Sequence, residues 1–161
     1  MSFTTNFELI QEAKKSGLPL VGVFNKDQLP KVPQNGFYII NLQDSQDEYG
    51  QDLDGTHWTV IYIEGRDACY FDSFGFPPPL EVQSFLKPYV PYPFNRQQIQ
   101  NERGGYCGVY VLYFMYYMTI HRAIIPNLRK RFTTFIRVWS VDVEDNLRRL
   151  KTFIRGKFPY L

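Results

Sequence analysis

The feature that most constrains this chain is an apolar segment that runs from Cys107 to Met118 and follows a Gly104-Gly105 pair. The segment contains no charged residue and has no polar face, which predicts a helix that is buried on all sides. A fold that contains such a helix must pack other elements around it. Cys107 would lie in the first turn of this helix.

The position of Cys107 gives its thiol two different interpretations. Unpaired backbone N–H groups and the positive end of the helix dipole favour a thiolate, as in a reactive cysteine. The preceding glycines would allow a substrate to approach the sulfur closely. However, cysteine is also among the residue types that are most often buried for packing alone. The segment by itself leaves both interpretations open.

The 161 residues are expected to form one domain, spanning 1–161, with a full core. The polar N-terminus does not have the pattern of a signal peptide, and residues 107–118 are too few to span a bilayer. Two cysteines predict free thiols in a reducing compartment. Because the only histidines are His57 and His121, neither a metal site nor a required cofactor is expected.

Charge is unevenly distributed along the chain. Residues 1–95 contain 6 Lys and Arg against 12 Asp and Glu, a balance of −6. Residues 96–161 contain 12 against 4, a balance of +8, and the two parts add to the overall +2. Much of the excess lies in Arg129-Lys130-Arg131 and in the last predicted helix. This pattern predicts a basic surface for an anionic partner such as DNA, or else an ordinary solvated helix face.

A predicted hairpin organises the middle of the chain, with strands at 57–63 and 68–74 and a turn at 64–67. Glycine at the first central turn position suits a two-residue type II′ turn. If residues 64 and 67 pair, His57 and Asp72 share one face as diagonal neighbours, with Cα atoms roughly 7–8 Å apart. A slip of one residue would place them on opposite faces.

Other elements follow from local patterns. Residues 37–42 predict a central strand, and residues 43–56 predict an exposed acidic loop. Residues 18–36 indicate a loop with short extended pieces, and residues 96–100 indicate a short strand. Ser140 is the expected N-cap of the last helix.

Nucleophilic catalysis by a cysteine needs a base, a group that orients the base, and donors for the developing oxyanion. His57 is the natural base, with Asp72 beside it to orient the imidazole. The side-chain amide of Gln100 and the backbone N–H of Cys107 are the candidate oxyanion donors. The alternatives are a strand histidine without a role, an aspartate that caps a bend, and a polar residue on an edge strand.

The second cysteine and the second histidine fit structural roles better. Cys69 lies in the middle of a predicted strand, away from any helix end, and is expected to be a buried packing residue. His121 follows the apolar helix and precedes Arg122, whose charge disfavours a second positive charge. His121 is therefore expected to be a helix-end residue.

The order of these motifs resembles the adenain family of viral cysteine proteases and, more distantly, the proteases that process SUMO. The seven-residue spacing from Gln100 to Cys107 is more similar to adenain, and the short chain is more similar to the maturation proteases of virophages and Polinton-type elements. The resemblance extends from residues 21–26 to a last helix and tail at 146–160. The motifs are Gly55-Thr56-His57-Trp58, Tyr70-Phe71-Asp72-Ser73-Phe74-Gly75-Phe76, Gln100 and Gly105-Tyr106-Cys107-Gly108.

The resemblance implies an α+β, papain-like fold that is circularly permuted, with a central mixed sheet and a buried helix carrying the nucleophile. It implies Cys107 as nucleophile, His57 as base and Asp72 as the third member, where adenovirus enzymes usually have Glu. Gln100 would be the oxyanion donor. The expected substrate-binding residues are Trp58, Gly105 and Tyr106.

The implied activity is that of a viral cysteine endopeptidase that cleaves capsid and other structural precursors during virion maturation. The implied location is the virion, and the host-cell cytoplasm or viral factory during assembly. A monomer is expected. Double-stranded DNA is a candidate activator or tether without sequence specificity, as in adenovirus enzymes. The chain has no cysteine between Cys69 and Cys107, so a peptide activator linked by a disulfide there is not expected.

Three alternative functions are compatible with the same residues. A deubiquitinase or SUMO-like deconjugase would use the same catalytic set but would need a broad surface for a folded partner. An acyltransferase would leave an acylated, unhydrolysed product. A catalytically idle, DNA-binding capsid component would not need an intact set of His57, Asp72, Gln100 and Cys107.

Overall fold

The computed structural model describes residues 6–42, 48–50, 57–102, 105–155 and 157, and it shows a mixed α+β fold. The strands are β1 (Leu20–Asn25), β2 (Gly36–Asn41), β3 (Trp58–Glu64) and β4 (Asp67–Phe71). The α-helices are α1 (Asn6–Lys15), α2 (Leu80–Phe85), α3 (Cys107–Ile120), α4 (Leu128–Arg137) and α5 (Val143–Arg155). Two short 3₁₀ helices, η1 (Lys26–Gln28) and η2 (Lys87–Tyr89), complete the described elements.

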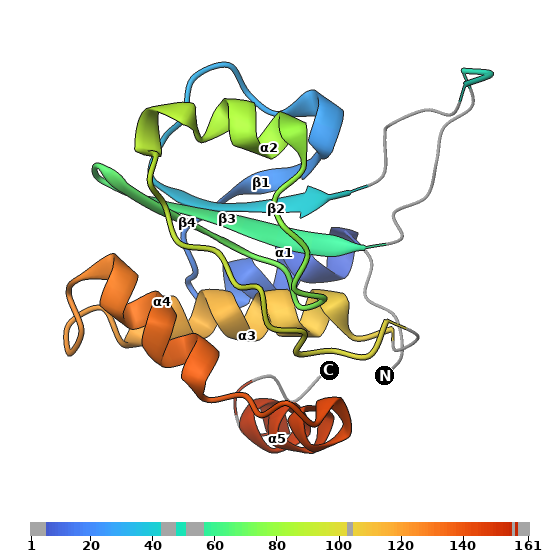
Figure 1. The fold of residues 1–161 in the computed structure, drawn as a ribbon, viewed down its shortest axis with the longest axis vertical. Helices are drawn as coiled ribbons and strands as arrows, with labels where there is room; N and C mark the ends of the chain where they lie inside the picture. The colour runs from blue at the N-terminus through green and yellow to red at the C-terminus, as the bar shows by residue number, and fades with distance from the viewer. Residues whose placement is uncertain (1–5, 43–47, 51–56, 103–104, 156, 158–161) are drawn as a thin grey trace.

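The four strands form one sheet in the order β1-β2-β3-β4. β1 and β2 are parallel, whereas β2, β3 and β4 pair antiparallel, so the sheet is mixed, as the resemblance implied. In Figure 1, α2 covers one face of the sheet, and α1, α3 and α4 lie on the other. α5 lies beyond α3, on the side away from the sheet. No helix in the described part of the chain is both long and apolar enough to cross a membrane.

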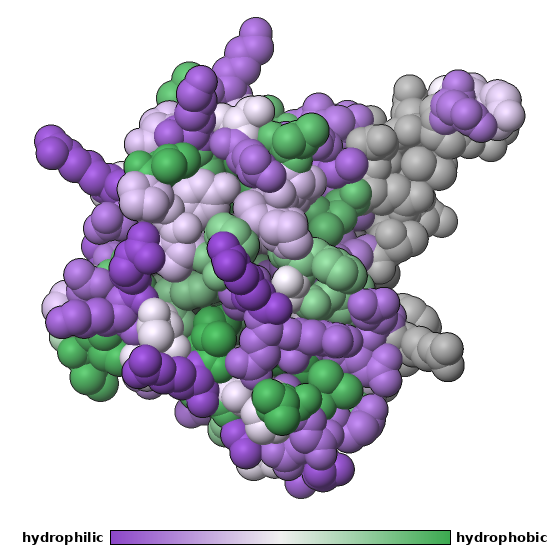
Figure 2. All heavy atoms as spheres, in the orientation of Figure 1, coloured by the Kyte–Doolittle hydropathy of each residue, from purple (hydrophilic) through white to green (hydrophobic). Residues whose placement is uncertain are grey.

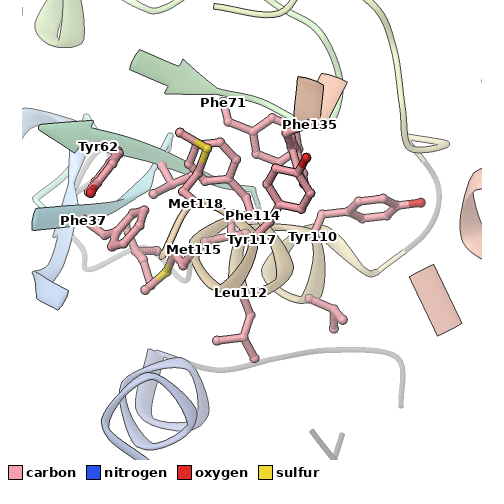
Figure 3. Packing of buried hydrophobic residues seen from close by; sticks show 14 of the residues in the cluster. Phe37, Tyr62, Phe71, Tyr110, Leu112, Phe114, Met115, Tyr117, Met118 and Phe135 are labelled. Carbon is pink, nitrogen blue, oxygen red and sulfur yellow. The ribbon is translucent and has the colours of Figure 1, made fainter. Parts of the chain in front are cut away.

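The apolar segment forms the buried helix α3, and the sheet and α4 pack against it. Phe114 of α3 stacks on Phe71 of β4 with ring centroids 5.0 Å apart, and it meets Phe135 of α4 edge to face at 5.1 Å. Leu112 points to the other side of the helix, toward α1 (Figure 3). Neighbours therefore surround α3, which explains why its sequence has no polar face.

The predicted hairpin register is confirmed. Glu64 pairs with Asp67, and the pairing continues to Val60 and Phe71, so each pair of residue numbers adds to 131. Gly65, the first central residue of the turn, has φ +65, whereas Arg66, the second, does not have a positive φ. This combination is the one that a type II′ turn requires. β4 ends at Phe71, earlier than predicted, because the chain bends at the next residues.

Two of the predicted segments differ in the structure. Within residues 18–36, predicted as a loop with short extended pieces, residues 20–25 form a full strand, β1, because β2 gives this segment a parallel partner that local sequence does not reveal. Residues 96–100 do not form a strand. The N–H groups of Ile99 and Gln100 both donate to the carbonyl of Ser73, at 2.9 Å, which makes a bend rather than a ladder.

The last helix begins with a different cap from the one predicted, and the acidic loop is described only in part. Asp142, not Ser140, caps α5: its Oδ1 accepts the N–H groups of Glu144 and Asp145. Of the predicted acidic loop, only residues 48–50 are described, and these are exposed. Residues 43–47 and 51–56, and the predicted tail at 158–160, lie outside the described residues.

The basic segment at 129–131 is not a single surface. Arg129 and Lys130 are exposed, whereas Arg131 is fully buried. The face shown in Figure 2 is largely hydrophilic, with small separate apolar areas. The basic surface predicted from composition must therefore exclude Arg131.

Candidate active site

The hairpin brings His57 and Asp72 together at one end of the sheet. Nε2 of His57 and Oδ1 of Asp72 are 2.6 Å apart, and Asp72 is 0% exposed. His57 lies just before β3, and Asp72 lies just after β4. The diagonal arrangement predicted from the register is therefore present as a buried, charge-assisted contact.

The Asp72 carboxylate serves two partners at once. Its Oδ1 also accepts the backbone N–H of Phe74 at 2.8 Å, which closes the bend after β4. The sequence offered the bend-capping and the histidine-orienting roles as alternatives, but one oxygen performs both. Oδ2 has no hydrogen-bond partner among the described residues.

The backbone of Asp72 is fixed by the buried side chain of Asn95. Oδ1 of Asn95 accepts the N–H of Asp72 at 3.1 Å, and Nδ2 donates to the Asp72 carbonyl at 2.6 Å. Nδ2 also donates to the carbonyl of Gln97 at 3.2 Å. Asn95 thus joins the Asp72 bend to the segment that leads to Gln100.

Phe74 covers the imidazole of His57. The two rings are stacked with centroids 3.7 Å apart and an interplanar angle of 5°. Gly75 follows with φ +77, and a Cβ there would come within 2.7 Å of the Gln97 backbone, so only glycine fits. The bend therefore places an aromatic ring on the histidine and restricts how that histidine can turn.

Cys107 is the first residue of α3, and its thiol is free and nearly buried. Tyr106 caps the helix without a side-chain hydrogen bond, so the first-turn N–H groups remain directed at this end of the helix. Cys107 therefore lies at the positive end of the helix dipole, as its sequence position predicted.

The pKa of His57 shows that Asp72 and Cys107 both act on the imidazole. Burial by itself lowers the pKa of His57, but the hydrogen bond to Asp72 and the charges of Asp72 and Cys107 outweigh burial and raise the pKa to about 9. Nδ1 makes no close hydrogen bond within the part of the chain described. Cys107 therefore contributes to the pKa of His57 without a hydrogen bond to Nδ1, and catalytic hydrogen bonds often tighten only when substrate binds.

Gln100 is buried near the same bend, with 3% of its surface exposed. The hydroxyl of Ser73 donates to its Oε1 at 2.6 Å. The other two glutamines of this segment are engaged elsewhere: Gln97 donates to the carbonyls of Trp139 and Ser140, and Gln98 donates to the Gln100 carbonyl. Of these three amides, Gln100 is the one tied to the Asp72 bend.

The three predicted substrate-binding residues have different settings. Trp58 packs in the main core with 5% of its surface exposed, so it offers little surface to a ligand. Gly105 and Tyr106 are half-buried and lead directly into Cys107. The ring of Tyr106 lies under the ammonium of Lys151, 5.5 Å from the ring centroid.

Cys69 and His121 have the structural roles that were expected. Cys69 is fully buried, and burial raises the pKa of its thiol. The ring of His121 stacks on Tyr117, and its Nδ1 lies 3.0 Å from the Tyr117 carbonyl at the end of α3. No group of three or more His, Cys, Asp or Glu side chains among the described residues could hold a metal ion.

Sequence reasoning did not assign Ser73, Phe74 or Asn95 to the site. Ser73 and Phe74 lie within the motif around Asp72, so their position was a signal, although their contacts were not predictable. Asn95 lies 23 positions after Asp72, and no local pattern links the two.

Comparisons with known proteins give limited similarity. No protein-family model matches the chain, and no curated protein matches it. Seven chains of solved structures match. One is the crystal structure of the selenomethionine form of an ASFV protease, with 18% identity and a TM-score of 0.37. The match covers 71% of this chain and 57% of that one, so the chain spans little more than half the length of that protease. The arrangement of side chains is therefore the basis for assigning an activity.

Proposed function

We propose that this protein is a cysteine endopeptidase with Cys107 as nucleophile, His57 as base and Asp72 as orienter. One observation carries the proposal: Asp72 binds Nε2 of His57 at 2.6 Å and leaves Nδ1 without a partner among the described residues. Cys107 begins helix α3 and contributes to the raised pKa of the same ring. A nucleophile, a base and an orienting acid in this relation are the components of covalent catalysis.

In the first step, the Sγ–H proton of Cys107 moves to Nδ1 of His57. Asp72 stabilises the imidazolium through Nε2, and the raised pKa of His57 favours this protonated ring. Sγ then forms a bond to the carbonyl carbon of the scissile peptide. The amide NH₂ of Gln100 and the backbone N–H of Cys107 are the proposed donors to the oxyanion.

In the following steps, the C–N bond breaks and Nδ1–H of His57 protonates the leaving amine. A water molecule attacks the resulting thioester and gives a proton to Nδ1. The C–Sγ bond then breaks and releases the carboxylic acid product, and the proton on Nδ1 returns to Sγ. No change of oxidation state and no further cofactor enters this sequence.

The substrate class in this proposal comes from the motif resemblance described above. It favours viral structural precursors cleaved during virion maturation, with His57, Asp72 and Cys107 in the order of the permuted, adenain-like proteases. Gly105 and Tyr106, which lead into Cys107, are the better candidates for contacting substrate. Trp58 would need to become more exposed to line the cleft.

The proposal can be tested by comparing virion proteins processed by active enzyme with those exposed to Cys107→Ala. Mass spectrometry should find new N-termini only with active enzyme. Iodoacetamide should label Cys107 and leave Cys69 unlabelled in the folded protein, because Cys69 is fully buried. Cleavage of ubiquitin or SUMO fluorophore substrates, without cleavage of virion proteins, would instead identify a deconjugase. Equal labelling of both cysteines, with no cleavage, would contradict the proposal.

A further inference from the structure

Ser73 contacts Gln100 through both its side chain and its backbone. Its hydroxyl donates to Oε1 of Gln100 at 2.6 Å, and its carbonyl accepts the Gln100 N–H at 2.9 Å. Ser73 is 1% exposed, so water does not compete freely for this hydroxyl. Ser73, a buried serine next to Asp72, therefore uses its hydroxyl to bind the candidate oxyanion donor.

In the structure the Ser73 hydroxyl acts as donor and holds Oε1 of the Gln100 amide toward the bend. A glutamine amide has an acceptor oxygen and a donor NH₂ of similar shape, and a half turn exchanges them. With Oε1 directed at Ser73, the NH₂ is on the opposite side of the amide. The reversed amide would present an oxygen, which repels an oxyanion rather than stabilising it.

The surroundings make Ser73 part of a rigid connection. Asn95 donates to the carbonyls of both Asp72 and Gln97, and Gly75 packs its Cα against the Gln97 backbone. The bend at 72–75 and the segment at 95–100 are therefore fixed to one another. Two adjacent residues, Asp72 and Ser73, then contact the base and the oxyanion donor.

We propose that Ser73 is a positioning residue that orients the Gln100 amide so that its NH₂ stabilises the oxyanion. This inference rests on the proposed peptidase function. It adds a residue that does not touch substrate and acts only through Gln100.

A double-mutant cycle on the full chain tests this inference, with cleavage of a small peptide as the readout. Ser73→Ala should lower kcat roughly tenfold, about the value of one buried hydrogen bond, with little change in KM. In a Gln100→Ala background, Ser73→Ala should lower kcat no further, because the amide that it orients is gone. Ser84→Ala, an exposed serine on α2, is the matched control and should leave kcat unchanged.

A merely structural role would give a different result. An equal loss of kcat from Ser73→Ala in both backgrounds would overturn the inference, as would full activity of the single variant. If Ser73→Ala does not fold, Ser73→Cys can replace it in the cycle, because a thiol has similar size but is a weak donor. Loss of activity in Cys107→Ala together with additive Ser73 and Gln100 effects would reject the role of Ser73 and leave the proposed function standing.

Discussion

A charged contact lies at each end of β3, and the two contacts differ in how many of their polar atoms are hydrogen-bonded. At the end of the strand, Glu64 binds Arg131, whose five N–H donors all have acceptors: Glu64 and the carbonyls of Met118, Ile125 and Pro126. Before the start of the strand, His57 binds Asp72, but His57 Nδ1 and Asp72 Oδ2 lack hydrogen-bond partners among the described residues. α3 meets both sites, with Cys107 at its start and Met118 near its end.

The difference separates a structural contact from a chemical one. Arg131 is fully satisfied, so its charge fixes α4 and the end of α3 to the hairpin and has no remaining capacity to react. His57 is anchored on one nitrogen and available on the other. A buried group with one unused polar atom is costly unless another species uses it, which is why we assign the chemistry to this end.

The largest expected effect is loss of cleavage when Cys107 or His57, at the end of β3 where polar atoms lack partners, is replaced. Cys107→Ala and His57→Ala should each lower kcat/KM by about 10⁴-fold or more, and the double variant should be little worse, because the residues act as a unit. Peptide cleavage by purified variants measures this. Cys69→Ala, the matched cysteine control, should retain most activity, and the comparison fails if Cys69→Ala is as inactive as Cys107→Ala.

The second effect concerns the Glu64–Arg131 contact at the other end of β3, and it appears in stability instead of activity. Glu64→Ala should lower the free energy of unfolding by about 3–5 kcal/mol, because it leaves the buried Arg131 guanidinium without its carboxylate. Urea denaturation gives this value. The control is Glu81→Ala, which breaks a more exposed ion pair with Lys26 and should cost about 1 kcal/mol or less. Per folded molecule, Glu64→Ala should cleave peptide at a rate close to the unchanged protein.

The third effect sharpens the assignment of Gln100. Gln100→Ala should lower kcat by ~10²–10³, the usual loss for one oxyanion donor, while the melting temperature changes little. Gln98→Ala is the comparison, because that amide donates to the Gln100 carbonyl and is not assigned to the oxyanion. Near-normal turnover in Gln100→Ala would mean that backbone donors suffice.

The sequence predicted those parts of the site that depend on local rules. The pairing of His57 with Asp72 followed from a two-residue turn and strict side-chain alternation, which fix a register over many residues. The position of Cys107 followed from glycines before an apolar helix. These features depend on neighbours in sequence, so a single chain contains the information.

The remaining features depend on contacts between distant segments. The place of β1 in the sheet could not be predicted, because it depends on β2 as a parallel partner. The buried Arg131 reads as a surface charge in sequence, since the acceptors around it come from β3, α3 and the loop before α4. The stacking of Phe74 on His57 likewise depends on the bend geometry and not on residue type alone.

The fourth effect is the contribution of His57 to the pH dependence of protein stability. The folded-state pKa of His57, about 9, lies above its ordinary value of about 6.5, so folding favours the protonated form. The stabilisation from His57 is then complete below about pH 6.5 and is lost as pH rises toward 9. Melting temperatures from pH 6 to 9 should fall more steeply for the unchanged protein than for His57→Gln. Parallel curves would contradict the raised pKa.

The smallest effect separates Arg131 from its neighbours Arg129 and Lys130 and tests the prediction of DNA binding. Arg129 and Lys130 are exposed and can neutralise phosphates, whereas Arg131 is committed to Glu64. If this surface binds duplex DNA, affinity should fall steeply with salt because counterions are released. Changing Arg129 and Lys130 together to Gln should reduce the salt slope by about 2, close to one for each lost phosphate contact.

Titration of random-sequence duplex DNA at several salt concentrations gives that slope, and cleavage of a small peptide can be followed in the same samples. The matched control is a pair of exposed basic residues on α5, Arg148 and Lys151, changed together to Gln. If the bound surface lies on α4 alone, this pair should leave the slope unchanged. If both pairs lower it equally, the surface extends across the two helices.

Binding without a rise in cleavage would indicate a tether rather than an activator. Absence of DNA binding at low salt would mean that these charges form an ordinary solvated helix face. Arg131 would then differ from Arg129 and Lys130 solely in being buried.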